Sequence, residues 1–372
     1  QYPWESADDG TEQCPDWTIE PDGTCYRCYV AVYEHHVTAA VAYGIYNYVR
    51  ITHDTEFLLH KGAEILIETA RFWKSRLQYI KENDRYEIHR VTGPDEWHEP
   101  VDNNVYTNYL ARWNLRYVTA LTEMLSREYP QEYTALVEKL GLTEEEIADW
   151  DAVAAKVYLP RKEGTQLLEQ FEGYFDLKEA VIEKYSNDWP IRPEILNTTK
   201  KCETQIIKQA DVVMLLHLMG QEFDEETTKL NYSYYEKRTL HGSSLSPSIY
   251  SIMGLKVGDD SKAYRYLRRA ALIDLVNLQG NTREGIHAAN AGGVWQVVVF
   301  GFAGVSLDEE GMLCICPHMP PEWNGLTFRI HHLDSWLEIT VHADNSVEVK
   351  VLEGGSVEIR IQGEKVTVRR EI

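Results

Sequence analysis

The sequence lacks three features that would place it in other classes of protein. It has no apolar run near the ~20 residues that cross a membrane. Positive charge is scarce, with 37 Lys and Arg against 59 Asp and Glu, and a net charge of −22 disfavours binding to nucleic acid or anionic lipid. The six cysteines are too few and too scattered for a disulfide framework in 372 residues. We therefore expect a cytoplasmic globular protein with neither a nucleic-acid nor a membrane partner.

The first residues and the cysteines add two expectations. QYPWESADDG has no Met, no basic segment and no apolar segment, so it does not resemble a signal peptide and is expected to be the interior of a longer polypeptide. Cys25 and Cys28 form a CxxC pair with Cys14 nearby, but no second pair follows at the spacing of a zinc finger. We expect ordinary thiols here rather than a metal or redox site.

Apolar residues with a helical period dominate the chain up to about residue 306. Thr143 with Glu146 three residues later has the pattern of a capping box at a helix start. The periodicity predicts helices near residues 37–50, 58–77, 104–124, 202–219, 223–235, 246–256, 260–275 and 287–300, and a further helix from 143. Residues 1–306 are therefore predicted to form a helical domain.

From about residue 307 the apolar period changes to two. Leu337, Ile339 and Val341 alternate with polar residues, and further strands are predicted around 347–351, 357–361 and 366–368. Asp344-Asn345, Gly354-Gly355 and Gly363-Glu364 are turn signals between them. We predict a small antiparallel β domain over residues 307–372, so that the fold is mainly α with a β tail.

The segment VTGPDEWHEPVDNNVYTN, residues 91–108, concentrates groups that can do chemistry. Five titratable side chains occupy eight positions: Asp95, Glu96, His98, Glu99 and Asp102. A carboxyl group beside other carboxylates and an aromatic ring has a raised pKa and can donate a proton to a glycosidic oxygen. A sugar site with a general acid and a plain polar loop before a capped helix are both consistent with this composition.

This segment resembles the catalytic-acid segment of glycoside hydrolase family 65, a family of inverting disaccharide phosphorylases with a few hydrolases. Other segments agree with the family in the same order along essentially the whole chain: YPWESADDGTE, HHVTAAVAYGIYNY, GAEILIETARFWKSR, QFEGYFDL, IIKQADVVMLLHL, HGSSLSPSIYSI, GNTREGIHAANAGGVWQ and PEWNGLTFRI. The resemblance implies an (α/α)6 barrel followed by a small C-terminal β-sandwich. It also implies that an N-terminal domain and the first barrel helices are missing, so that the barrel is partial.

The resemblance assigns Glu96 as the general acid that protonates the leaving oxygen. Asp95 and His98 are its neighbours, expected to orient it and to bind substrate. Glu5 resembles a residue of an acceptor-side loop that binds sugar hydroxyls. No metal is implied at any of these positions.

Two further segments are assigned by the same resemblance. Lys208 and Gln209, expected on the helix 202–219, would hold hydroxyls of the glucosyl unit. The loop His241, Gly242, Ser243, Ser244, placed before a helix that Pro247 helps to start, would bind phosphate, with His287 lining the same region. A Ser hydroxyl and free N–H groups at a helix N-terminus suit an anion, although plain capping by Ser244 or Ser246 is the alternative.

We therefore predict inverting phosphorolysis of an α-glucosyl disaccharide of the kojibiose or trehalose type to β-glucose 1-phosphate. Inorganic phosphate is the co-substrate, no cofactor is needed, and the intact protein is expected to be a homodimer. The loop 240–247 contains no carboxylate to activate water, which favours phosphorolysis, although Glu236 and Glu284 are close in sequence. The alternatives are an inverting α-glucoside hydrolase on the same fold and an inactive carbohydrate-binding fragment.

Overall fold

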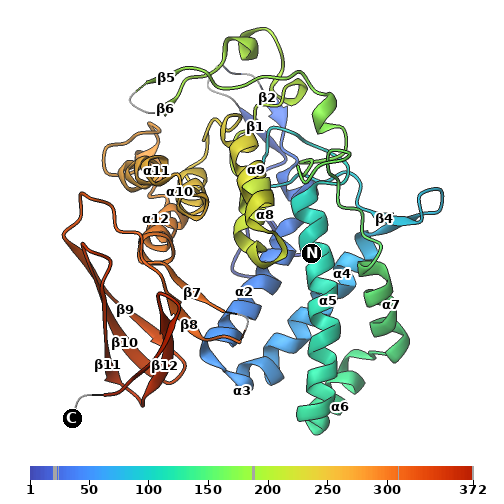
Figure 1. Cartoon of the computed structure of the whole chain (residues 1–372). Helices are drawn as coiled ribbons and strands as arrows, with labels where there is room; N and C mark the ends of the chain where they lie inside the picture. Colours follow the sequence, from blue (N-terminus) through green and yellow to red (C-terminus); the bar gives the residue numbers. More distant parts are fainter. Residues whose placement is uncertain (20–22, 24, 187–188, 309, 371–372) are drawn as a thin grey trace. The chain divides into compact units, whose positions relative to one another are not determined.

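The computed structural model describes residues 1–19, 23, 25–186, 189–308 and 310–370. The chain divides into two compact units. Unit 1 contains Gln1–Val49, Asp54–Val181 and Pro193–Ile207, and unit 2 contains Arg50–His53, Ile182–Arg192 and Lys208–Ile372. Most of the chain is helical and a small β domain follows at its C-terminal end (Figure 1), as the sequence predicts. In the described part of the chain, no helix is long and apolar enough to cross a membrane.

Unit 1 is built around the long helix α5, Val105–Glu128, which packs against α4 and α7. The helices of this unit are α1 (Val30–Tyr33), α2 (His36–Thr52, whose last residues belong to unit 2), α3 (Thr55–Phe57), the π-helix η1 (Leu58–Gly62), α4 (Ala63–Arg76), α5, α6 (Pro130–Leu140) and α7 (Glu144–Ala154), with short 3₁₀ turns at Tyr174–Asp176, Glu194–Asn197 and Lys201–Glu203. Asn104 caps α5 by accepting a hydrogen bond from the N–H of Thr107. This cap fixes the point at which the 91–104 segment ends.

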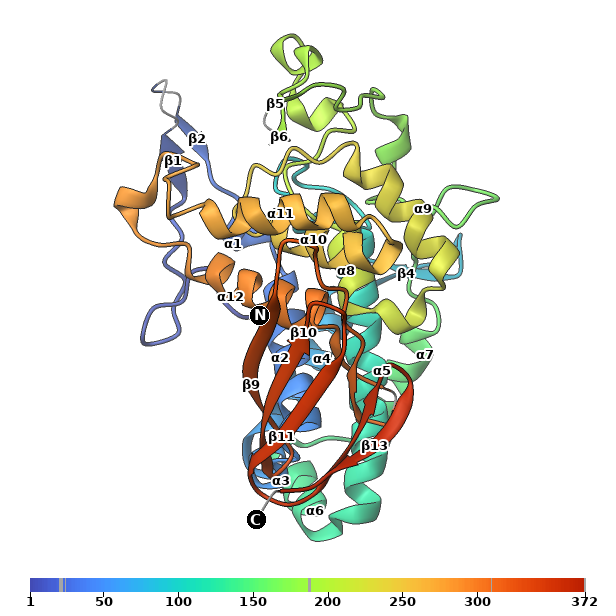
Figure 2. The same ribbon diagram turned by 60° about the vertical axis from the view of Figure 1, so that its left-hand side comes forward.

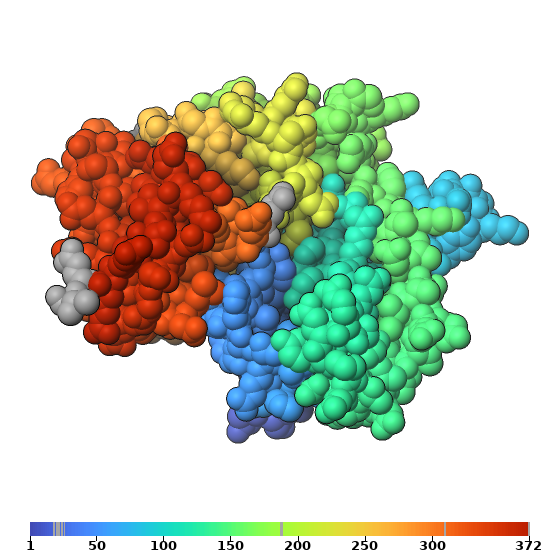
Figure 3. All heavy atoms as spheres, turned by 60° about the horizontal axis from the view of Figure 1, so that its bottom comes forward, coloured from blue at the N-terminus to red at the C-terminus, as the bar shows by residue number. Residues whose placement is uncertain are grey.

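Two short hairpins complete unit 1. They pair β1 (Trp17–Ile19) with β2 (Cys25–Arg27), and β3 (Gln78–Ile80) with β4 (Arg85–Glu87). The N–H of Tyr158 donates to the carbonyl of Tyr86, so the second hairpin is joined to the chain that follows α7. Figure 3 shows this hairpin, in light blue, standing out beside the green residues. The acid-rich segment begins directly after β4.

The helical part of unit 2 surrounds α10, Ser246–Val257, which is apolar on nearly all sides and packs against α8, α9, α11 and α12. Its helices are α8 (Val212–Leu218), α9 (Glu225–Glu236), α10, α11 (Asp260–Leu272), α12 (Ala288–Gln296) and the π-helix η7 (Val297–Phe302), with 3₁₀ turns at Gly220–Glu222 and Thr282–Glu284 and a short pair of strands, β5 (Tyr185–Ser186) and β6 (Trp189–Pro190). Figure 2 shows α10 and α11 side by side. The loop 241–244 therefore leads into a firmly packed helix.

The β domain consists of two sheets around one apolar core. The strands are β7 (Val305–Leu307), β8 (Leu313–Ile315), β9 (Gly325–His332), β10 (Ser335–His342), β11 (Val347–Glu353), β12 (Val357–Ile361) and β13 (Glu364–Val368), in the orders β11-β10-β9 and β13-β12-β8-β7 (Figures 1 and 2). Alternate residues of both sheets, including Ile315, Ile339 and Ile359, are buried in the shared core. The predicted alternation and turn positions are confirmed.

The expectation of a purely antiparallel domain is wrong for one pair of strands, because β8 and β12 run parallel. Strands joined by a tight turn must be antiparallel, whereas β8 and β12 are separated by the whole sheet β9–β11 and can pair in either direction. The register aligns Leu313 with Ile359 and Ile315 with Ile361, which places the apolar residues of both strands opposite each other.

The predicted helix 202–219 is also wrong over its first half. The helix α8 begins only at Val212, and residues 204–211 contain no helix, with bridge positions at Thr204, which pairs with Lys178, and at Ile207. The backbone here is engaged elsewhere, because Gln205 N–H donates to the carbonyl of Lys178. A helix would have to break this long-range contact, so the local apolar pattern was misleading.

Candidate functional site

The residues that the sequence singles out fall into both units. Glu5, Asp95, Glu96 and His98 belong to unit 1, whereas Lys208, Gln209, His241–Ser244 and His287 belong to unit 2. The two sets are described separately below. Among the described residues, His, Cys, Asp and Glu side chains form no group of three or more that could hold a metal ion.

Glu96 lies in a turn of the segment 91–104, which we call the acid loop. Its side chain is half-buried, whereas Asp95 and His98 on either side of it are 1% and 2% exposed. The loop begins after β4 and ends at the capped start of α5, so both of its ends are held by regular structure. Glu96 and Glu99 are thus partly accessible carboxyl groups of a largely buried loop, and Asp102 is exposed.

Asp95 forms the centre of a buried hydrogen-bond cluster inside the acid loop. His98 Nδ1 lies 2.6 Å from Asp95 Oδ2, and Gln170 Nε2 donates to the same oxygen at 3.0 Å. His98 Nε2 lies 2.9 Å from the carbonyl oxygen of Thr204. Both ring nitrogens of His98 therefore face oxygen atoms. The cluster ties the acid loop to two distant segments, at Gln170 and Thr204.

The turn that carries Glu5 is organised by the carboxylate of Glu12. The N–H groups of Trp4 and Glu5 donate to the two carboxylate oxygens of Glu12 at 2.6 and 3.0 Å. The ring of Trp4 contacts that of His36, whose Nδ1 lies 3.3 Å from the carbonyl of Thr92 in the acid loop. Unit 1 therefore brings the predicted acceptor-side turn close to the first residues of the acid loop. Glu5 itself is exposed.

In unit 2, Lys208 lies directly beside the predicted phosphate loop. The N–H of Gly242 donates to the carbonyl of Lys208 at 2.8 Å. A Cβ at Gly242 would lie 3.4 Å from Cγ of Lys208, so the two residues are in close contact. Gln209, the next residue, is 9% exposed. These contacts join the two segments that the sequence assigned to glucosyl and phosphate binding.

His241 is a buried residue whose ring is neutral. Its Nδ1 lies 2.8 Å from Ser246 Oγ and its Nε2 lies 3.2 Å from the Tyr266 hydroxyl. Burial, and then the nearby Arg269 guanidinium, lower the pKa of His241 to about 3. Its backbone has a positive φ of 52°, which orients the start of the 241–244 loop.

Ser243 and Ser244 are half-buried and lie just before α10. The N-cap of this helix is Leu245, which has no side-chain cap. The expected capping by Ser244 or Ser246 is therefore not what the structure shows: Ser243 Oγ accepts from Leu245 N–H at 3.3 Å, and Ser246 contacts His241. The start of α10 retains the partial positive charge that suits an anion.

His287 belongs to a separate contact at the start of α12. Its Nδ1 lies 2.6 Å from Asp274 Oδ1, and its backbone N–H donates to Asp274 Oδ2 at 2.8 Å. These hydrogen bonds lower the pKa of Asp274. The pair orients the imidazole by a carboxylate, as in many sites where a histidine must be held in one position.

Glu236 is the acidic residue that lies nearest to His241 through described contacts, and its carboxylate is already engaged. It is 4% exposed, accepts from the Tyr266 hydroxyl at 3.0 Å and pairs with Lys262 at 2.9 Å. Tyr266 therefore separates Glu236 from His241. Both of these contacts are made to Oε1 of Glu236.

Several residues around the site were not found from the sequence. Gln170 and Glu87 contact the acid loop, whereas Tyr266 contacts His241. Gln170 lies in the QFEGYFDL segment, and that position was the available signal for it. The others come together only through tertiary contacts.

Comparison with known proteins identifies relatives of the chain. The chain is 51% identical over 370 residues to the kojibiose phosphorylase of Thermoanaerobacter brockii, covering 99% of this chain and 48% of that protein. It is 35% identical over 373 residues to the α,α-trehalose phosphorylase of the same organism, covering 99% of this chain and 46% of that protein. A solved structure assigned as a kojibiose phosphorylase from the human microbiome superposes with a TM-score of 0.84 at 29% identity, covering 98% of this chain and 51% of that one.

The chain thus spans about half the length of the curated relatives it matches. A family model for the C-terminal domain of glycosyl hydrolase family 65 matches residues 308–368. The model for the central catalytic domain of the same family matches residues 1–296. The chain belongs to glycosyl hydrolase family 65.

Proposed function

We propose that the protein carrying this chain is an inverting phosphorylase of an α-linked glucosyl disaccharide, of the kojibiose or trehalose type. The observation that carries the proposal is the hydrogen bond between Gly242 and Lys208, because it joins the predicted glucosyl-binding and phosphate-binding segments within one unit. The names of relatives at 51% and 35% identity support kojibiose ahead of trehalose. In this proposal the helical domain, residues 1–306, is part of an (α/α)6 barrel that precedes the β-sandwich of residues 307–372.

In the proposed reaction a phosphate oxygen attacks the anomeric carbon on the face opposite the leaving sugar. Glu96 gives its proton to the glycosidic oxygen as the bond to that carbon breaks, and inversion yields β-glucose 1-phosphate. Lys208 and Gln209 hold glucosyl hydroxyls, while Gly242, Ser243 and Ser244 at the start of α10 bind phosphate. His241 acts here through position rather than charge, because its ring is neutral. Asp95 and His98 keep the acid loop in place.

Phosphorolysis is favoured over hydrolysis by the character of the 241–244 loop. It offers hydroxyl groups and a helix start, whereas a hydrolase needs a carboxylate that can take a proton from water. The neighbouring Glu236 is bound to Lys262 and Tyr266. Phosphate brings its own nucleophilic oxygen, so no base is needed in this part of the site.

The test is to incubate the full-length protein with kojibiose, trehalose, maltose or nigerose, with and without phosphate, and to measure β-glucose 1-phosphate and glucose. We expect phosphate-dependent β-glucose 1-phosphate. E96Q should lower kcat by about 100-fold or more, the contribution typical of a general acid. Equal glucose release without phosphate would identify a hydrolase instead, and absence of turnover with retained sugar binding would identify a carbohydrate-binding protein.

A further inference from the structure

The base of the acid loop is closed by a set of paired backbone contacts. Asn103 N–H donates to the carbonyl of Ile88 at 2.8 Å, and Ile88 N–H donates to Oδ1 of Asn103 at 3.1 Å. Val91 and Val101 exchange hydrogen bonds at 2.9 and 2.8 Å. The position of Glu96 therefore depends on how firmly Ile88 and Asn103 are held together.

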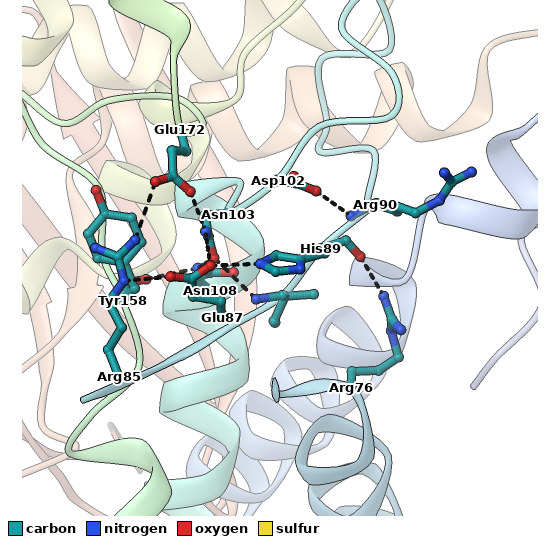
Figure 4. A network of polar contacts seen from close by, with 11 residues as sticks. Arg76, Arg85, Glu87, His89, Arg90, Asp102, Asn103, Asn108, Tyr158 and Glu172 are labelled. Carbon is teal, nitrogen blue, oxygen red and sulfur yellow. Dashed lines mark hydrogen bonds and ion pairs between the residues drawn. The ribbon is translucent and has the colours of Figure 1, made fainter. Parts of the chain in front are cut away.

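Asn103 is a fully buried residue whose amide uses both of its polar atoms. Nδ2 donates to Glu172 Oε2 at 2.7 Å and to Glu87 Oε2 at 3.2 Å, and Oδ1 accepts from Ile88 N–H and from Asn108 Nδ2. Figure 4 shows Asn103 between these two carboxylates. An amide supplies two donors and an acceptor together, which a carboxylate or a hydroxyl cannot do here. Its positive φ of 53° is a conformation that Asn tolerates well.

The two carboxylates are held in turn by cations. Glu87 pairs with Arg85 at 2.6 Å and lies 2.7 Å from His89 Nε2. Burial by itself would raise the pKa of Glu87, but the hydrogen bonds from His89, Arg85 and Asn103 outweigh it and lower the pKa. Arg85 also reaches Glu172 at 3.3 Å and lies over the ring of Tyr158 (Figure 4). Both acceptors of the Asn103 amide thus also contact Arg85.

The segment 170–172 links this base to the inside of the acid loop. The N–H of Glu172 donates to the carbonyl of Asp102 at 3.1 Å, and the carbonyl of Gln170 accepts from Val105 N–H at 2.9 Å. The side chain of Gln170 donates to Asp95, which precedes Glu96. A change at Asn103 or Glu172 is therefore transmitted to the residue beside the general acid.

We propose that Asn103 and Glu172 are positioning residues for the general acid: together with Glu87 and Gln170 they form a clasp that sets the direction of the Glu96 carboxyl. This proposal rests on the proposed function. It names groups that contact neither the sugar nor the phosphate but on which the reaction depends. Proton transfer requires hydrogen-bond reach and alignment, so a small shift of the loop lowers kcat while leaving sugar binding nearly unchanged.

A substrate that needs no proton separates a positioning role from a merely structural one. With a disaccharide, phosphate forms a bond to the anomeric carbon, the glycosidic bond breaks, and the leaving oxygen takes the proton of Glu96. With α-glucosyl fluoride, phosphate forms the same bond, the carbon–fluorine bond breaks, and fluoride leaves with the electron pair unprotonated. Damage to the clasp should therefore affect the disaccharide alone.

The test compares N103D with N345D in the full-length protein. N103D keeps the shape of the side chain but places a third carboxylate against Glu87 and Glu172. We expect its kcat for the disaccharide to fall about 100-fold, the share that general-acid catalysis supplies, with KM and α-glucosyl fluoride turnover changed by less than about 3-fold. The loss should shrink as pH falls and one carboxyl becomes protonated. Asn345 also has a positive φ and accepts a backbone N–H, from Met319, so N345D is the matched control and should behave as wild type.

E172A gives a second test that does not depend on a buried substitution, because the Glu172 side chain is 44% exposed. It should show the same selective loss at about 10-fold. In N103D/E172Q the amide and the carboxylate exchange places, so part of the disaccharide activity should return. Equal losses with both substrates, or wild-type kcat in both N103D and E172A, would overturn the clasp. If wild-type protein makes no β-glucose 1-phosphate from any disaccharide, the proposed function itself fails, which is a different result.

Discussion

The carboxylate of Asp95 is buried and accepts hydrogen bonds from His98 and Gln170 on one oxygen, with a longer contact of 3.4 Å from Trp97 N–H on the other. These contacts are all within the protein, so the conformation of the acid loop is held by its own hydrogen bonds and not only by contacts to a substrate. A buried charge that has partners stabilises the loop, whereas the same group without partners would destabilise it. The loop is thus a structural unit as well as a carrier of Glu96.

We expect D95N to lower the free energy of unfolding by about 1–3 kcal/mol, because the amide forms weaker hydrogen bonds with His98 and Gln170 than the buried carboxylate does. D102N is the matched control in the same loop: Asp102 is exposed and accepts from the backbone N–H of Arg90. D102N should lower the free energy of unfolding by less than about 0.5 kcal/mol. Urea unfolding of both variants checks the prediction, which equal losses would contradict.

At the level of secondary structure, the sequence patterns correctly predicted strands and helix caps that depend on residues close together in the chain. The alternation at Leu337–Val341 identified β10, and the N-cap at Thr143 is present, with Glu146 N–H donating to its hydroxyl. The second half of that capping box is not formed, because the Glu146 carboxylate pairs with Arg71 of α4 instead. Contacts between residues far apart in the chain, such as this one, could not be predicted from local sequence patterns.

The same limit explains what was found and missed in the site. The acid loop was visible because Asp95, Glu96 and His98 are consecutive or nearly so. The non-helical path at Gln205 depends on Lys178, and the position of Lys208 depends on Gly242. The neutral state of His241 depends on burial among Tyr250, Tyr266 and Trp189. None of these partners is adjacent in sequence, so neither feature has a local signal.

Helix packing in unit 2 gives a prediction with a control in the neighbouring residue. A Cβ at Gly293 of α12 would lie 2.7 Å from Ser248 Oγ and 3.0 Å from Ser248 Cβ of α10, whereas one at Gly292 would meet nothing within 4 Å. G293A should therefore destabilise by about 1–3 kcal/mol through overpacking. G292A should be neutral or stabilise by up to about 1 kcal/mol, because Ala is the better helix former. Similar effects of both substitutions on thermal unfolding would contradict the close α10–α12 packing.

For the whole molecule, buried neutral histidines predict how stability depends on pH. Burial lowers the pKa of His35, His36 and His217 to about 4 each and that of His241 to about 3. Arg76 and Lys256 add to the lowering at His35 and His217, whereas the hydrogen bond to the backbone of Thr92 opposes it at His36. In the unfolded chain a histidine has a pKa of about 6.5. Between these values the unfolded state binds more protons than the folded state, so stability rises with pH and is lost as pH falls below about 6.5.

At pH 5 each of these four histidines should have lowered the free energy of unfolding by about 2 kcal/mol relative to pH 7, since one pKa unit corresponds to about 1.4 kcal/mol. Carboxylates with lowered pKa values, such as Glu87 and Asp224, lose their contribution only at lower pH, so they do not obscure this range. Urea unfolding at pH 7, 6 and 5 should show a progressive loss of stability. H217Q removes one titrating group and should make the slope shallower by the share of one histidine. A flat profile between pH 7 and 5, or an unchanged slope in H217Q, would show that these rings gain protons without unfolding the protein.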